Sequence, residues 1–288
     1  MQAVLVLAHK NVDQVVELAD LLSKKFEVYI HFDKKAHITS EQKLALKRPH
    51  VQWISTQDVH WGAWSIVQAT IDLFNLALQN PQLSYFHLIS GQDWPTKNVA
   101  DIYNFFEKTD KLFIWNYPSA KYKKAGEPLV DWQKYYFNYD QVNRRSTWGK
   151  IYHRFLIVGQ TLLHVNKLKK LGIDLTLYNG SQWVDLPRDA SEYLLGYLQE
   201  HPNVVQMFKT GFCSDEFWVP TVLRNNRQFA QRIDTNNHRY IDWQERNGSA
   251  PAVLDERDLA KVSESDAFFM RKIEFPQSRK LVDELNLK

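Results

Sequence analysis

The first 116 residues alternate between short apolar runs and longer segments whose apolar residues recur every three or four positions. A short apolar run predicts a buried strand, and a spacing of three or four predicts an amphipathic helix. This pattern predicts strands at 3–7, 26–32, 51–54, 85–89 and 112–116, and helices at 12–24, 39–46, 65–78 and 99–106. Strands that alternate with helices are typical of a parallel sheet covered by helices, so the predicted fold class is α/β.

The pattern changes at Tyr117, where the chain becomes basic, aromatic and irregular as far as Arg145. We therefore place the main boundary between residues 1–116, a nucleotide-binding half, and residues 117–288, an acceptor and catalytic half. No long linker or low-complexity tract separates the two halves. The whole chain, residues 1–288, is accordingly predicted to be one domain with a shared core.

Composition narrows the class of protein. A hydrophobic fraction of 44% is ample for a folded core, and the net charge of +3 is too small to indicate a nucleic-acid-binding protein. The one cysteine, Cys213, excludes an internal disulfide and a zinc site built from cysteines, and it favours a reducing compartment. The apolar run at the N-terminus is too short for a signal peptide, and no window approaches the ~20 apolar residues of a membrane span. We expect a cytoplasmic protein whose membrane contact, if any, is peripheral.

Polar side chains follow several of the predicted strands, at the sheet edge where open parallel sheets bind ligands. The loop at 30–35 offers His31 and Asp33, and the loop at 89–96 offers Asp93. A solvated loop and a plain turn are the competing interpretations of these two segments.

A third loop, at 60–65, combines aromatic and small residues. Trp61 and Gly62 would let a flat ligand approach the backbone closely, and Ser65 is predicted to cap the helix that follows. Packing alone would explain Trp64 more easily than Trp61.

An acidic pair, Asp215 and Glu216, precedes an apolar segment and lies among aromatic residues. A carboxylate held in such a place can accept the proton of an incoming hydroxyl. The alternative is that Ser214 or Asp215 only caps the following helix and that Glu216 completes its acidic first turn.

The chain resembles glycosyltransferase family fourteen, which comprises the core-2/I-branching β-1,6-N-acetylglucosaminyltransferases and the peptide O-xylosyltransferases. The resemblance rests on seven motifs in order: IHFDKK at 30–35, HWGAWSIVQATI at 60–71, LISGQDWPTK at 88–97, GSQWVDLPRD at 180–189, SDEFW at 214–218, HRYIDW at 238–243 and FFMRKIE at 268–274. It implies a GT-A type glycosyltransferase fold, with a Rossmann-like nucleotide-binding half and a mixed acceptor half, and an inverting transfer.

The resemblance also implies roles for single residues at the donor. His31 and Asp33 would contact the uridine of a UDP-sugar, and Trp61, Gly62 and Ser65 would line the same pocket. All five lie in the motifs at 30–35 and 60–71.

At the reacting end, the resemblance makes Glu216 the general base. Asp215 would contact or orient the acceptor, and Trp183 would stack on an acceptor sugar. Asp93 would lie near the donor sugar.

No Asp-x-Asp motif occurs in the chain, so no metal or other cofactor is expected; we read the similar Glu264–Asp266 as a helix start. The resemblance implies that Arg239 and Lys272 neutralise the diphosphate instead, because fixed cations can bind phosphate oxygens without a metal. Arg271 lies beside Lys272 and competes with it for this role.

The predicted activity is therefore metal-independent, inverting transfer from a UDP-sugar, with UDP-N-acetylglucosamine first and UDP-xylose second. The expected acceptor is an oligosaccharide or a lipid-linked saccharide in surface polysaccharide synthesis, and the expected location is the cytoplasm or the inner face of the membrane. Two alternatives are a non-catalytic carbohydrate-binding protein and a polyanion-binding protein that uses the basic aromatic segment 117–145.

Overall fold

The computed structural model describes residues 1–285. Among these residues seven strands form a central sheet, in the order β12-β6-β11-β4-β1-β2-β3. Strands β3, β2, β1 and β4 run parallel, whereas β11 runs antiparallel to both of its neighbours. The strands are β1 Gln2–Ala8, β2 Glu27–Phe32, β3 Val51–Ile54, β4 Tyr85–Ser90, β6 Leu112–Phe113, β11 Asp185–Pro187 and β12 Ile233–Asp234. The parallel part confirms the predicted α/β pattern of the first half.

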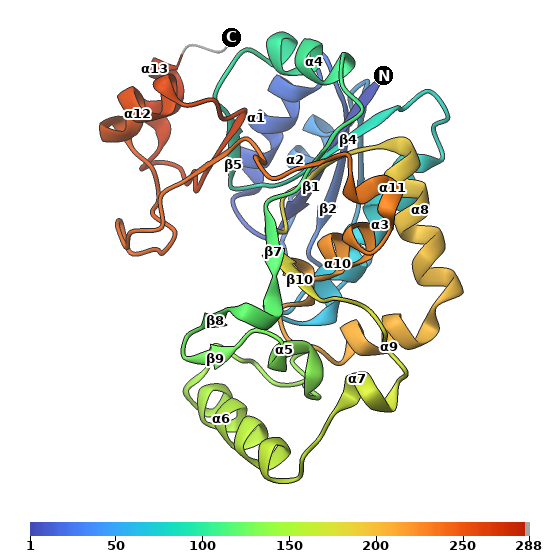
Figure 1. Cartoon of the computed structure of the whole chain (residues 1–288). Coiled ribbons are helices and arrows are strands. Elements are labelled where there is room, and N and C mark those ends of the chain that lie inside the picture. Colours follow the sequence, from blue (N-terminus) through green and yellow to red (C-terminus); the bar gives the residue numbers. More distant parts are fainter. Residues whose placement is uncertain (286–288) are drawn as a thin grey trace.

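The burial of strand β1 explains why its sequence is an almost continuous apolar run. All seven of its residues are buried, because helices cover both faces of the sheet (Figure 1). Ala3, Leu5 and Leu7 pack with α3 (Trp64–Leu78), and Val4 and Val6 pack with α1 (Val12–Leu22) on the other face. Successive side chains of a strand point to opposite faces, so one strand supplies both cores.

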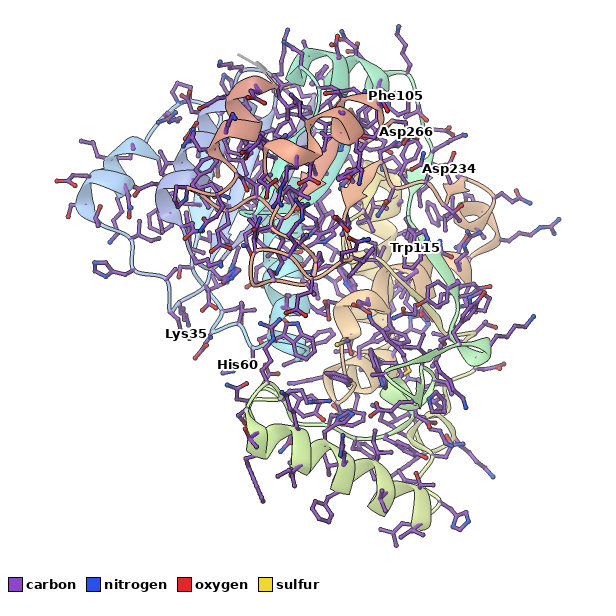
Figure 2. The ribbon with its side chains drawn as sticks, turned by 90° about the vertical axis from the view of Figure 1, so that its left-hand side faces the viewer. Lys35, His60, Phe105, Trp115, Asp234 and Asp266 are labelled. Carbon is purple, nitrogen blue, oxygen red and sulfur yellow. The ribbon has the colours of Figure 1, made fainter. Side chains whose placement is uncertain are left out.

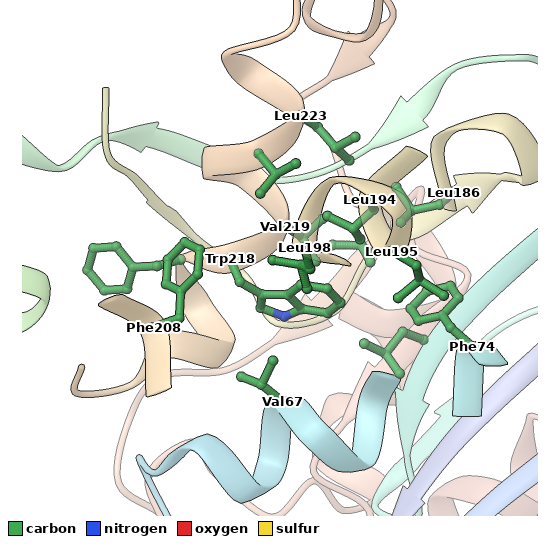
Figure 3. Close-up of a cluster of buried hydrophobic side chains, with 14 of the residues drawn as sticks. Val67, Phe74, Leu186, Leu194, Leu195, Leu198, Phe208, Trp218, Val219 and Leu223 are labelled. Atoms are coloured by element: carbon green, nitrogen blue, oxygen red, sulfur yellow. The ribbon is translucent and has the colours of Figure 1, made fainter. Parts of the chain in front are cut away.

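The core on the α3 face continues under the second half of the chain. Helices α8 (Arg188–Glu200) and α10 (Trp218–Arg224) pack there, with Trp218 at the centre of the cluster in Figure 3. The indole of Trp218 lies among Val67 of α3 and leucines of α8. Because Trp218 is buried, the residues directly before it are held in one position.

A second sheet ties the C-terminal part of the chain to the first half. It contains β13 (Arg239–Ile241), β14 (Phe269–Arg271) and β5 (Asp93–Pro95). Strand β14 pairs antiparallel with β5, which brings Arg271 opposite Asp93. The loop predicted at 89–96, for which a plain turn was the competing interpretation, therefore turns at 91–92 and then forms a strand.

The predicted strand 112–116 is divided between two sheets. β6 ends at Phe113, and β7 (Asn116–Pro118) pairs instead with β10 (Tyr178–Gly180). From there the chain builds a lower lobe, shown at the bottom of Figure 1. Its elements are β8 Lys123–Lys124, β9 Glu127–Pro128, α5 Asp131–Lys134, α6 Thr147–Leu162 and α7 Lys167–Lys170.

The remaining helices cover the sheet and the tail. They are α2 Ser40–Ala45, α4 Val99–Glu107, α9 Pro202–Lys209, α11 Arg227–Ala230, α12 Leu259–Glu264 and α13 Arg279–Glu284. The predicted helices at 12–24, 39–46, 65–78 and 99–106 are each present within two residues of their predicted ends. Within residues 1–285, no helix is long and apolar enough to cross a membrane.

Candidate active site

The acidic pair lies in a single turn of 3-10 helix, η2 (Ser214–Glu216), directly before α10. No side chain caps either helix; the Ser214 hydroxyl donates instead to the Phe208 carbonyl at 2.6 Å. The capping interpretation of this segment is therefore wrong. The buried Phe217 and Trp218 fix the turn from its C-terminal side, and the side chain of Glu216 remains 25% exposed.

Glu216 is held by two side chains from the second half of the chain. Lys124 Nζ donates to Oε1 at 3.1 Å and to Oε2 at 3.0 Å, and Asn179 Nδ2 donates to Oε2 at 3.3 Å. Burial disfavours the Lys124 ammonium, but the Glu216 carboxylate outweighs that effect and raises the pKa of Lys124. Asn179 is itself oriented by the Tyr117 hydroxyl, which donates to its Oδ1 at 2.8 Å.

Asp215 has a different environment from its neighbour. Its Oδ1 is buried and has no hydrogen-bond partner among the described residues. Burial, followed by repulsion from Glu216, raises the pKa of Asp215 to about 7. Asp215 is therefore only partly ionised near neutral pH.

The loop at 60–65 packs directly against this segment. Cys213 N donates to the Gly62 carbonyl at 2.9 Å, and the Trp61 ring meets the edge of Phe212 with 5.7 Å between centroids. Gly62 has φ +73, and a Cβ atom there would lie 2.7 Å from Phe212 Cε2. Only glycine suits this position, because it allows both the left-handed backbone and the close approach.

Ser65 does not cap α3, contrary to the prediction. The helix begins at Trp64, and its N-cap, Ala63, has no side-chain hydrogen bond. The Ser65 hydroxyl instead accepts a hydrogen bond from His60 N at 2.8 Å, so it closes the loop on itself.

His31 and Asp33 are buried and bind the loop that follows β3. His31 Nε2 accepts from the backbone N–H groups of Thr56 and Gln57 at 3.3 and 3.2 Å, and burial lowers the pKa of His31. Asp33 accepts from Lys35 N at 2.9 Å and from Val59 N at 3.4 Å. Both side chains shape the loops at the ends of β2 and β3.

A group of cations gathers past the carboxyl end of β1. Burial, followed by the positive charges of Arg271, Lys10 and Arg145, lowers the pKa of Lys272. The Lys272 ammonium donates to the Ser249 hydroxyl at 2.9 Å, and Lys10 pairs with Glu274 at 2.9 Å.

Arg145 reaches the same region from the lower lobe. Its guanidinium lies over the indole of Trp61, 4.8 Å from the ring centroid. The Trp61 side chain is 47% exposed, so part of the ring remains open to a ligand.

Arg271 and Lys272 occupy different positions. The Arg271 guanidinium pairs with Asp93 Oδ1 at 3.1 Å and lies over the ring of Trp183, 4.4 Å from its centroid. Lys272 has only a hydroxyl as its hydrogen-bond partner among residues 1–285. The positive charge of Arg271 is therefore compensated by a carboxylate, and that of Lys272 is not.

Arg239 is almost fully buried and forms a bidentate ion pair with Asp185. Its two terminal nitrogens donate to the carboxylate at 2.9 and 2.8 Å, and Nη1 also donates to the Asn237 carbonyl at 2.7 Å. His87 Nδ1 bonds to the same carboxylate at 2.9 Å. Burial opposes the charge of Asp185, but Arg239 and His87 outweigh it and lower the pKa of Asp185.

The structure thus brings together three groups of predicted residues: Asp215 with Glu216, Trp61 with Gly62, and Asp93 with Trp183 through Arg271. It places His31, Asp33 and Arg239 inside hydrogen-bond networks of the protein itself. Three further side chains at the site, Lys124, Asn179 and Arg145, were not predicted as site residues. Lys124 and Arg145 lie in the basic aromatic segment 117–145, which is the sequence pattern that could have identified them. No sequence pattern marks Asn179.

Two surface hollows lie away from this site. One, of about 670 Å³, is lined by residues of α4 and β12 that include Phe105 and Asp234. Figure 2 shows both residues at the upper right, away from Lys35 and His60, which lie left of and below the centre. The other lies at the amino ends of β1 and β4, where Met1 and Tyr85 line it. Within residues 1–285, no group of three or more His, Cys, Asp or Glu side chains is arranged to hold a metal ion.

Comparison with known proteins gives one family and two curated relatives. The model of the Core-2/I-branching enzyme family matches residues 5–267. β-Glucuronosyltransferase GlcAT14A of Arabidopsis thaliana is 29% identical over 124 residues, which are 42% of this chain and 28% of the relative. β-Glucuronosyltransferase GlcAT14B of the same plant is 25% identical over 123 residues, with the same coverage. The chain thus spans about a quarter of the length of these relatives.

The family match covers both halves of the chain. It agrees with the motifs that carry the resemblance and with the α/β architecture, which is the GT-A-like fold predicted from the sequence. The chain belongs to the Core-2/I-branching enzyme family.

Proposed function

We propose that this protein is an inverting glycosyltransferase that transfers a sugar from a UDP-sugar to a hydroxyl group of a saccharide. In the proposed step, Glu216 accepts the proton of the acceptor hydroxyl while its oxygen forms a bond to the anomeric carbon. The bond from that carbon to the diphosphate breaks on the opposite face, and UDP leaves with the electron pair. The observation that carries this proposal is the Glu216 carboxylate, which Lys124 and Asn179 hold in the segment that packs against the Trp61 loop.

The environment of Glu216 suits a base. Lys124 and Asn179 together make three hydrogen bonds to its two oxygens. A carboxylate offers about four acceptor positions, so one remains for the acceptor hydroxyl. Asp215, whose pKa is raised to about 7, is partly protonated at neutral pH and is better suited to donate a hydrogen bond to the acceptor.

Lys272 is the cation we assign to the diphosphate. Burial and, after it, three other positive groups lower the pKa of Lys272, and a bound diphosphate would oppose the effect of those charges. Arg271 is compensated by Asp93 and Arg239 by Asp185, so neither has a free charge to offer. In the proposed transfer the fixed charge of Lys272 takes the place of a metal.

The uridine end of the donor is assigned to the open ring of Trp61 and to Arg145 above it. His31 and Asp33 act in this proposal by holding the 56–59 loop that borders the pocket. Gly62 and Ser65 act in the same way, because they fix the loop that presents Trp61.

Three donors are proposed, in the order UDP-N-acetylglucosamine, UDP-xylose and UDP-glucuronic acid. The last enters because both curated relatives are named β-glucuronosyltransferases. A glucuronosyl group differs from the other two sugars in its carboxylate, which requires a cation at the sugar end of the donor. The proposed acceptor is an oligosaccharide or a lipid-linked saccharide in surface polysaccharide synthesis.

Calorimetric titration with UDP and with each of the three UDP-sugars tests the donor. We expect binding in the presence of EDTA, with one sugar nucleotide bound more tightly than the others. Binding that requires manganese would refute the metal-independent step. The absence of any binding would favour the non-catalytic carbohydrate-binding or polyanion-binding alternatives.

A matched pair of variants tests the base. Glu216→Gln should lose transfer, because the amide cannot accept the proton, and should bind UDP as the wild type does. Glu200→Gln, at the exposed end of α8, serves as the control and should keep full activity. Substantial transfer by Glu216→Gln would show that another group is the base.

A further inference from the structure

Helix α6 carries an exposed apolar stripe along its whole length. Trp148, Phe155 and Leu162 are 66%, 72% and 73% exposed, and Ile151 and Val158 between them are also exposed. These five residues are spaced by three or four positions, which places them on one face of the helix. An exposed face of this kind is the reverse of the pattern expected for a surface helix of a globular protein.

The inner face of α6 is fixed by polar contacts. His153 Nε2 bonds to Glu127 Oε1 at 2.9 Å, and the Gln160 side chain exchanges two hydrogen bonds with the backbone of Tyr136, at 2.7 and 2.9 Å. Gly149 packs so closely on Asn143 that a Cβ atom would lie 2.0 Å from the Asn143 carbonyl oxygen. The orientation of the helix is therefore set by its inner face, and the apolar face is left to the outside.

The segment around the helix is strongly basic. Residues 141–173 contain seven Lys and Arg and no Asp or Glu, whereas the rest of the chain has a formal charge of −4. Lys150 and Arg154 are exposed and flank the stripe. The positive charge of the protein is thus concentrated at the end of the molecule that carries the apolar face (Figure 1).

We propose that α6 lies in the headgroup region of a membrane that contains anionic lipids. The stripe enters the boundary between headgroups and acyl chains, and the flanking Lys and Arg side chains reach the lipid phosphates. An indole at this depth is typical of the membrane interface, and Trp148 supplies one. Each basic residue near the surface adds electrostatic attraction that salt screens.

A second copy of the chain is the competing occupant, and two features oppose it. Pairing through α6 would bring together two segments that each carry seven positive charges and no negative ones. The helix is about 24 Å long and about 10 Å wide, so a pair would bury a few hundred Å². Stable interfaces bury about 1,200–2,000 Å².

The position of α6 relates membrane docking to the candidate active site. His153 of α6 bonds to Glu127, and Glu127 pairs across the β8-β9 hairpin with Lys124, which holds Glu216. Docking would therefore place the acceptor side of the site next to the bilayer and favour a lipid-linked acceptor. That consequence rests on the proposed function, whereas the docking itself is measured by binding alone.

Vesicle flotation of the full chain tests the proposal. We expect binding to phosphatidylcholine vesicles that contain about a quarter phosphatidylglycerol, weaker binding to phosphatidylcholine alone, and loss of binding in high salt. Phe155→Asp should lower the partition coefficient about tenfold or more, and the pair Lys150→Gln and Arg154→Gln should remove the preference for the anionic lipid. Leu44→Asp is the control, because Leu44 is equally exposed on α2 and should have no effect.

A fluorescent probe tests the location of the contact. Phe155→Cys can be labelled selectively with an environment-sensitive dye, because the native Cys213 is buried. We expect a blue shift on anionic vesicles for this position and none for Leu44→Cys. Absence of binding to anionic vesicles, or equal shifts at the two positions, would overturn the proposal. A concentration-dependent shift at Phe155→Cys without lipid, with a dimer in sedimentation, would assign the face to a second copy.

Discussion

Replacing Arg239 and Lys272 one at a time by Met separates the cation that maintains the fold from the cation that we assign to the donor. Arg239→Met leaves the Asp185 carboxylate buried without its bidentate partner. Removing one member of a buried ion pair typically costs about 3–5 kcal/mol, because the remaining charge is uncompensated. For a domain of this size, that corresponds to a decrease in melting temperature of about 6–20 °C.

Lys272→Met should affect UDP binding rather than the melting temperature. The ammonium has only the Ser249 hydroxyl as a partner and is repelled by Arg271, Lys10 and Arg145, so its removal should leave the melting temperature nearly unchanged. If the diphosphate binds there, the loss of one charge-assisted contact, about 1.5–3 kcal/mol, weakens UDP binding roughly 10- to 150-fold.

Thermal unfolding and calorimetric titration with UDP, on both variants and the wild type, measure the two effects. Lys43→Met, an exposed lysine on α2, is the matched control for loss of one positive charge. The reasoning is refuted if Arg239→Met melts at the wild-type temperature and loses UDP binding. That result would mean that the guanidinium leaves Asp185 to bind the diphosphate, as the sequence resemblance implies.

Three further changes test other parts of the structure. Gly62→Ala should destabilise the fold by about 1–3 kcal/mol. Gly126→Ala is the control for backbone strain alone, because Gly126 has a positive φ but no neighbouring atom within 4 Å of an added Cβ. Equal losses of stability in the two variants would exclude the clash with Phe212. The pKa of Asp215 is raised to about 7, so the folded state keeps a proton that the unfolded state has already released. Stability should therefore fall as the pH rises from about 4 to about 7. Thermal unfolding of Asp215→Asn should not show this fall. Burial lowers the pKa of Lys167 to about 7, so stability should rise from about pH 7 to about pH 10, where the unfolded state still holds the proton; in Lys167→Met this rise should be absent.

The elements of the first half were predictable because their signals are local. The continuous apolar run of β1 and the periodicity of α3 each fall within one segment of the chain. The sheet of β13, β14 and β5 was not predictable, because each strand has three residues and its partner lies far away in the sequence. The predicted cap at Ser65 was wrong because α3 begins one residue earlier, at Trp64, after the extended Ala63.

At the candidate site, too, features with a local sequence pattern could be predicted, whereas contacts between distant residues could not. The acidic pair and the loop around Trp61 stand out in the sequence as unusual local combinations. The contact between Lys124 and Glu216 spans 92 residues, and the ion pair between Arg239 and Asp185 spans 54. No local sequence pattern shows whether a basic residue in the tail forms an ion pair with a distant carboxylate. The choice among Arg239, Arg271 and Lys272 as the cation for the diphosphate depends on such ion pairs.

The neighbours Asp215 and Glu216 show how the fold can give two adjacent carboxyl groups different roles. Both lie in the single turn of η2, yet Glu216 receives Lys124 from the lower lobe and Asn179 from β10, whereas Asp215 Oδ1 has no partner in the described chain. Burial without compensation retains a proton on Asp215, and the charge of Glu216 adds to this effect because like charges disfavour ionisation. Asn keeps the neutral charge of a protonated Asp215, so Asp215→Asn should preserve transfer better than Glu216→Gln does. Comparable losses of transfer rate in the two variants would show that proton transfer is not confined to Glu216.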